Sequence, residues 1–149
     1  MPFRCEIVTQ DRKLYEGQAD MVVAPGTEGL MGILPNHAPL LSTLELGLLT
    51  VRYQGQEQVF TIAGGLIEVL PDAVTVLADS GENVAEIDEQ RAESARRRAE
   101  ELLAKGPPPD TAEYLAIQAA LRRSTLRLKV ARKHRGHGPP PGRAPEGRN

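Results

Sequence analysis

The sequence predicts an α+β fold, in which an N-terminal all-β sandwich or barrel is followed by a C-terminal antiparallel αα-hairpin. Short runs of Val, Ile, Leu, Thr and Tyr fill the first 80 residues, and Gly, Pro, Asn or Asp interrupts them every few residues. From residue 88 onward, apolar residues recur at three- and four-residue steps, as on one face of a helix. The charge balance also changes, from 4 basic and 11 acidic residues over 1–84 to 12 basic and 8 acidic residues over 85–135.

We therefore expect three segments: a β-domain over residues 1–84, a helical hairpin over 85–135 and a disordered tail over 136–149. The tail is rich in Gly and Pro and cannot bury an apolar core. The 149 residues are 40% hydrophobic but only 3% aromatic, so the core of the β-domain must be aliphatic. Cys5 alternates with apolar neighbours and is interpreted as a small core residue, with a nucleophile as the less favoured reading.

Within the β-domain, the turn-forming residues divide the chain into separate strands. Gly47 and the Gly64-Gly65 pair are interpreted as breaks between strands. Gln54-Gly55 is predicted to be a two-residue hairpin turn, since Gly adopts a positive φ without steric cost. Seven apolar runs are predicted as strands: Phe3–Thr9, Ala19–Ala24, Leu40–Leu46, Leu48–Tyr53, Glu57–Ala63, Leu66–Leu70 and Ala73–Leu77.

Two helices are predicted from their capping residues and from apolar residues that form a stripe along one face of each helix. Asp88 can cap the first helix, and a Gly-Pro-Pro-Pro run at residues 106–109 ends it. Asp110, with Glu113 three residues later, resembles a capping box that begins the second helix. The stripe of the first helix is mostly Ala, and a buried CH₂ contributes only about 0.8 kcal/mol. We therefore expect a weakly held hairpin that docks on another surface or switches between arrangements of similar free energy. The stripes contain Ala92, Ala95, Ala99, Leu102 and Leu103 on the first helix and Ile117, Leu121 and Leu128, with Tyr114 beside them, on the second.

The most specific pattern lies in residues 26–41, where three glycines at three-residue spacing precede a loop between two prolines. The loop carries Asn36 and His37. From these residues alone, a well-ordered structural loop is favoured over a partner-contact loop. A metal site is disfavoured, because no second His or Cys lies nearby in the sequence.

This segment resembles the Gly-x-x-Gly-x-x-Gly-Ile-x-Pro-x-His-Ala-Pro-Leu signature of the epsilon subunit of bacterial F-type ATP synthases. Residues 59–69 resemble a second signature of that family, and the likeness covers about residues 3–133. It implies a sandwich of about ten strands in a non-catalytic rotor subunit of the central stalk. Such a subunit couples proton-driven rotation of the membrane ring to ATP synthesis, and its hairpin acts as an ATP-sensed inhibitor of ATP hydrolysis.

The same resemblance implies partners and a location. The partners would be the gamma subunit, the c subunits of the rotor ring and, through the hairpin, the catalytic alpha and beta subunits. The chain would be a peripheral protein at the cytoplasmic face of the cell membrane. Met31, Asn36 and His37 would lie in the loop that contacts the ring. Leu30 stands where some relatives carry an acidic residue, which puts an ionic contact with the ring in doubt.

A regulatory nucleotide site is a separate hypothesis. Helical spacing places Arg91 and Arg98 on one face of the first helix and Arg123 and Arg127 on one face of the second. By spacing alone, solvated helix faces are favoured, and no P-loop motif occurs. However, residues 87–92 resemble the Ile-Asp-x-x-Arg-Ala motif of bacterial epsilon subunits that bind ATP, with or without magnesium, without hydrolysing it. The resemblance implies that adenine and ribose face Glu82, Ile87, Asp88 and Ala92, and that the phosphates face Arg91, Arg98, Arg123 and Arg127.

Other functions are less favoured by the residues. No nucleophile–base pair or metal cluster is recognisable, so we expect no catalytic residues, no metal and no required cofactor. A net charge of −2 disfavours nucleic-acid binding, and the lack of a run of 18 apolar residues disfavours a membrane span. No signal peptide is expected at the N-terminus. The main alternative is a stand-alone β-sandwich binding module with a helical interaction arm.

Overall fold

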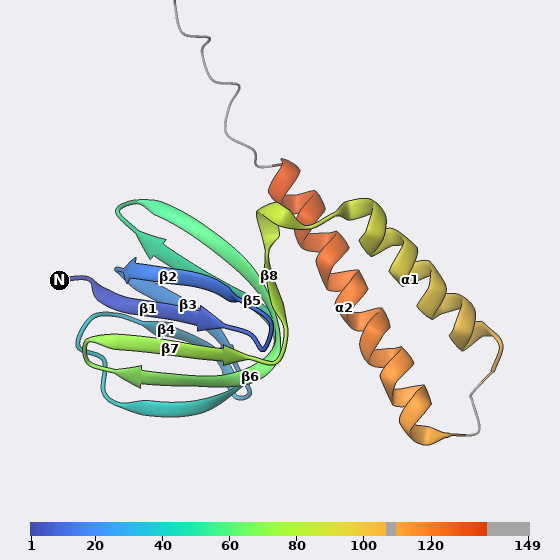
Figure 1. Cartoon of the computed structure of the whole chain (residues 1–149), viewed down its shortest axis with the longest axis horizontal. Helices are drawn as coiled ribbons and strands as arrows, with labels where there is room; N and C mark the ends of the chain where they lie inside the picture. Colours follow the sequence, from blue (N-terminus) through green and yellow to red (C-terminus); the bar gives the residue numbers. More distant parts are fainter. Residues whose placement is uncertain (107–109, 137–149) are drawn as a thin grey trace, which may run out of the picture.

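The computed structural model describes residues 1–106 and 110–136, which form a β-sandwich followed by two long helices (Figure 1). The predicted α+β class is therefore confirmed. The sequence predicts a tail from residue 136, but Gly136 is the last residue of the second helix. The rest of the predicted tail, 137–149, and the three prolines at 107–109 lie outside the described residues. The elements are β1 (Phe3–Val8), β2 (Lys13–Ala19), β3 (Met21–Gly26), β4 (Gly29–Ile33), β5 (Leu40–Tyr53), β6 (Gln56–Leu70), β7 (Ala73–Ala78), β8 (Gly81–Asn83), the 3₁₀ helix η1 (Val84–Glu86), α1 (Glu89–Ala104) and α2 (Thr111–Gly136).

The strands pair in the order β2-β1-β7-β6-β5-β3-β4. Strands β1 and β7 pair in parallel, and the other neighbours in this order are antiparallel. The first half of β6 pairs with β8 and its second half with β7. The sheet therefore folds over in the middle of β6, and this fold closes the sandwich around its core (Figure 1).

The strand breaks predicted at Gly47 and at Gly64-Gly65 are wrong, because these glycines lie inside β5 and β6. The ladder between the two strands runs from Tyr53 opposite Gln56 to Leu40 opposite Val69 and skips only one position on each strand. The glycines therefore bend a continuous strand pair and do not end it. The described residues accordingly form eight strands, where the family resemblance implies about ten.

Gly65 illustrates why glycine is needed at the bend. Its φ is +129°, and a Cβ there would lie 2.2 Å from the carbonyl oxygen of Leu77 on β7. Backbone therefore passes over backbone at this point, and only a residue without a side chain fits. The bend also changes which alternate residues of β6 face inward, since Phe60 and Ile62 are buried before it and Ile67 and Val69 after it.

Among the described residues, the sandwich core is formed by the β-domain alone, and apart from two Phe residues and one Cys it is aliphatic. Cys5 is fully buried, which confirms its interpretation as a core residue, and this burial raises the pKa of its thiol to about 12. Tyr15 packs edge-on against Phe60, with 6.2 Å between the ring centroids. The sandwich thus holds together without any contribution from the helices to its core.

The hairpin begins and turns at the predicted caps. The Asp88 carboxylate accepts a hydrogen bond from the Arg91 N–H at 3.1 Å, and Asp110 accepts one from the Ala112 N–H at 2.9 Å. Within α1, only Ala92 and Ala99 are buried, so α1 contributes few buried carbon atoms to the hairpin. The far end of the hairpin points away from the sandwich (Figure 1). None of the described helices is long and apolar enough to cross a membrane.

Candidate functional site

The C-terminal half of α2 docks on the sandwich through a small apolar cluster, which we call the docking cluster. Its buried members are Val84 and Ile87, in and next to η1, and Val130 and Ala131 on α2. They pack against partly buried Leu48, Val59 and Leu126. The cluster shares no residue with the sandwich core, so the contact of α2 with the sandwich is not part of that core.

Toward the N-terminus of α2 from this cluster, the sandwich and the hairpin border a space of about 450 Å³, which we call the sandwich–hairpin cleft. It lies between β6 and β8 on one side and the hairpin on the other. Its floor is partly apolar, and three arginines reach it from different places in the chain. The polar residues that line it are Arg12, Thr61, Ser80, Glu82, Arg123, Ser124 and Arg127.

A second depression lies between the hairpin helices, with a volume of about 640 Å³. We call it the arginine groove, because α1 contributes two guanidinium groups and α2 a third. Planar guanidinium groups suit phosphate oxygens, and three arginines line this one depression. The residues that line it are Asp88, Gln90, Arg91, Ser94, Ala95, Arg98 and Arg127.

The predicted nucleotide-site residues divide among these places. Four of them, Asp88, Arg91, Arg98 and Arg127, line the arginine groove. Glu82 and Arg123 line the sandwich–hairpin cleft, and Arg127 lines both. Ile87 and Ala92 are 5% and 0% exposed, so in this conformation they offer almost no surface to a ligand.

An ion pair between Arg127 and Glu82 lies between the sandwich–hairpin cleft and the arginine groove. The Nε–H of Arg127 donates to Oε1 of Glu82, and its Nη2 donates to Oε2 at 3.3 Å. Both side chains are largely buried, with 28% of Arg127 and 21% of Glu82 exposed. Sequence reasoning placed both residues at the site but missed their pairing, because nothing in the spacing of β8 and α2 indicates it.

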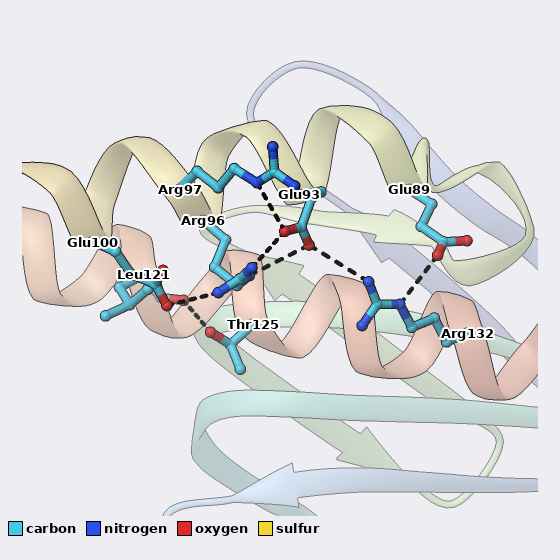
Figure 2. A network of polar contacts seen from close by, with 8 residues as sticks. All are labelled: Glu89, Glu93, Arg96, Arg97, Glu100, Leu121, Thr125 and Arg132. Carbon is cyan, nitrogen blue, oxygen red and sulfur yellow. Dashed lines mark hydrogen bonds and ion pairs between the residues drawn. The ribbon is translucent and has the colours of Figure 1, made fainter.

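The two helices are also joined by a network of charges on the hairpin surface (Figure 2). Arg132 of α2 donates to Glu89 at 3.1 Å and to Glu93 at 3.5 Å, and both carboxylates belong to α1. Glu93 also receives hydrogen bonds from Arg96 and Arg97. The hydrogen bond from Arg96 is the main reason that the pKa of Glu93 is lowered. Charged contacts thus supplement the few buried carbon atoms that α1 contributes.

The predicted partner-contact loop lies beside the β6–β7 turn, at the end of the sandwich away from the hairpin (Figure 1). Asn36 has a φ of +62°, and its N–H donates to the Pro71 carbonyl at 3.0 Å. The Nδ1 of His37 lies 2.7 Å from the Ala38 carbonyl oxygen, as in a structural histidine. Met31 is partly buried against the core.

Three leucines of residues 30–41, the segment that contains this loop, are more than half exposed to solvent. Leu30 is 76% exposed, Leu34 56% and Leu41 68%. Sequence reasoning used only the first of these leucines and missed the other two. Leu41 lies in the predicted strand Leu40–Leu46, and β5 presents it to solvent.

Two family models match the chain. ATP synthase, Delta/Epsilon chain, beta-sandwich domain matches residues 2–84, and ATP synthase, Delta/Epsilon chain, long alpha-helix domain matches residues 85–132. Among curated relatives, the ATP synthase epsilon chain of Herpetosiphon aurantiacus is 46% identical over 135 residues, which are 91% of this chain and 98% of that one. The epsilon chain of Syntrophobacter fumaroxidans is 48% identical over 130 residues, which are 87% of this chain and 96% of that one.

Two solved structures are also similar. A chain in the Euglena gracilis mitochondrial ATP synthase, in a structure of OSCP, F1 and the c-ring, superposes with a TM-score of 0.70 at 25% identity over 84% of this chain and 78% of that one. A chain of the central stalk and c-ring of Tetrahymena thermophila mitochondrial ATP synthase shares the fold, with a TM-score of 0.57 at 17% identity over 88% of this chain and 97% of that one.

Proposed function

Because this chain belongs to the delta/epsilon chain family of ATP synthase subunits, we propose that it couples proton-driven rotation of the membrane ring to ATP synthesis within the rotor. The family is a non-catalytic stalk component of the complex. In this proposal the sandwich joins the gamma subunit to the c subunits, at the cytoplasmic face of the membrane. The loop with Asn36 and His37, Met31 on the preceding strand β4 and the exposed leucines of residues 30–41 would contact the ring.

We further propose that the hairpin is a brake on ATP hydrolysis. The docking cluster carries this proposal, because it attaches α2 to the sandwich through few apolar residues and leaves the sandwich core untouched. When docked, the hairpin permits turnover. When extended, the basic side chains of α2 meet acidic surfaces of the alpha and beta subunits and block hydrolysis. ATP favours the docked state to the extent that it binds that state more tightly.

The test of the brake uses the assembled complex. Removal of residues 88–149 should raise ATP hydrolysis at low ATP and change it little at high ATP. A matched control removes only residues 137–149 and keeps both helices. If hydrolysis at low ATP is the same with and without residues 88–149, the hairpin is not a brake.

The nucleotide site is tested on the isolated full-length chain by calorimetry. We expect heat on titration with ATP and a loss of affinity in Arg91→Ala, because Arg91 lines the arginine groove. Arg97→Ala is the matched control: it lies on the same helix but contacts Glu93 at 3.2 Å and does not belong to the groove lining. The absence of heat at millimolar ATP in the wild-type chain would remove the nucleotide site, while the rotor assignment would stand.

A further inference from the structure

Arg127 occupies a position that no other charged residue shares in the described hairpin: it lines both the sandwich–hairpin cleft and the arginine groove. Glu82 approaches it from the cleft. This carboxylate holds the Nε edge of the guanidinium through two hydrogen bonds, from Nε and from Nη2. An arginine has five N–H donors in a fixed plane, so three remain for another acceptor.

The pair fixes the direction of a long and otherwise mobile side chain. A guanidinium that is clamped on one edge by a carboxylate has its orientation set before a ligand arrives, which lowers the entropy lost on binding. Arg91 and Arg98 are held less firmly: the Arg91 side chain is 85% exposed and meets the Asp88 carboxylate at 3.8 Å, and Arg98 reaches the Ser94 carbonyl at 3.4 Å. Arg127 is therefore the fixed member of the three guanidinium groups in the groove.

We propose that Glu82 is a positioning residue for phosphate binding: it orients Arg127 toward Arg91 and Arg98 and does not itself contact the base or the ribose. This inference rests on the proposed nucleotide site and changes the role of one of its residues. Glu82 belongs to β8 of the sandwich, whereas Arg91 and Arg98 belong to α1. The three guanidiniums consequently face one ligand only while α2 is docked.

The choice of ligand separates the two roles of Glu82. Tripolyphosphate carries the phosphate chain of ATP without base or sugar. If Glu82 positions Arg127, Glu82→Gln weakens ATP and tripolyphosphate alike, by about tenfold, the size expected for losing a charge-assisted hydrogen bond. If Glu82 contacts the base or ribose, only ATP is weakened. If Glu82 merely competes with phosphate for Arg127, both ligands bind more tightly. Either of the last two results would overturn the proposal.

A double-mutant cycle provides the second measurement. Arg127→Lys keeps the positive charge but loses the planar fork, so Glu82→Gln should have no further effect on tripolyphosphate affinity in that background. Additive losses would show that Glu82 acts without Arg127. Glu82→Asp, which keeps the carboxylate, should restore some of the affinity.

Loss of docking is controlled with Val130→Ala, which weakens the docking cluster and leaves the ion pair in place. For an equal loss of α2 protection in hydrogen exchange, Glu82→Gln must weaken tripolyphosphate more than Val130→Ala does. Equal losses would reduce Glu82 to a docking residue. A wild-type chain that binds neither ligand would remove the nucleotide site together with this inference, whereas a wild type that binds both leaves only the role of Glu82 in question.

Discussion

Truncation of Val130 to Ala should loosen the hairpin without weakening the sandwich. The change removes two carbon atoms from the docking cluster, where Val130 is 6% exposed. At about 0.8 kcal/mol for each buried carbon, the docked state loses about 1.6 kcal/mol, or roughly fifteenfold in the docking equilibrium. A surface pocket of about 350 Å³ adjoins Val130, so the truncation opens onto solvent and adds little cost for a closed cavity.

Hydrogen exchange on the full-length chain measures this loss. Amides of α2 whose exchange requires undocking should lose roughly fifteenfold in protection, and amides of β1 and β7 should keep theirs. Leu115→Ala is the matched control, because Leu115 is also on α2 but is 57% exposed. Equal losses in α2 and in the sandwich strands would mean that the two domains open together. Unchanged protection in α2 would mean that the docking cluster does not hold the helix.

Three further predictions concern other regions of the chain. Gly65→Ala should lower the free energy of unfolding by about 4 kcal/mol through strain and overlap with β7, whereas Gly55→Ala, which has open space around it, should cost about 1 kcal/mol; similar urea midpoints for the two variants would contradict this. Arg132→Gln should reduce α2 protection by less than about 1 kcal/mol, because the side chain is 61% exposed, and the difference from wild type should vanish in about 1 M salt. A difference that persists in salt would show that Arg132 acts by packing. Cys5 should resist thiol reagents at about pH 8 in the native chain and react on unfolding. Since the pKa of Cys5 is raised from 9.0 to about 12, its contribution to stability is full below pH 9 and is lost as the pH rises toward 12. Labelling of the native chain at the rate of the unfolded chain would refute this assignment.

Local signals were sufficient for much of the fold. The caps at Asp88 and Asp110 formed as predicted, because a cap depends on residues three positions away or fewer. The Gln54-Gly55 turn also formed, with φ values of +52° and +74°. By contrast, the sequence around Gly65 predicts a turn, and the structure has a continuous strand there. The reason that glycine is needed at this position is the Leu77 carbonyl on a neighbouring strand, a tertiary contact that the nearby sequence does not indicate.

The same distinction applies to the candidate site. Helical periodicity was enough to place Arg91 and Arg98 on one face, and the structure puts both in the arginine groove. Periodicity gave no account of Val130, because this residue lies off the predicted stripe of the second helix and is buried in the docking cluster. The pairing of Glu82 with Arg127 depends on how α2 docks on β8, which no spacing within either element determines.

The small number of carbon atoms that α1 buries in the hairpin also has a consequence for solubility. When a pair of packed helices separates, it usually exposes apolar surface, and such surface drives aggregation and recruits chaperones. Here the separation of α1 from α2 uncovers mainly Ala92 and Ala99 on α1 and frees the charged groups of Arg132 and Glu93, which water solvates well. An opened α1 therefore offers little apolar surface to unrelated proteins.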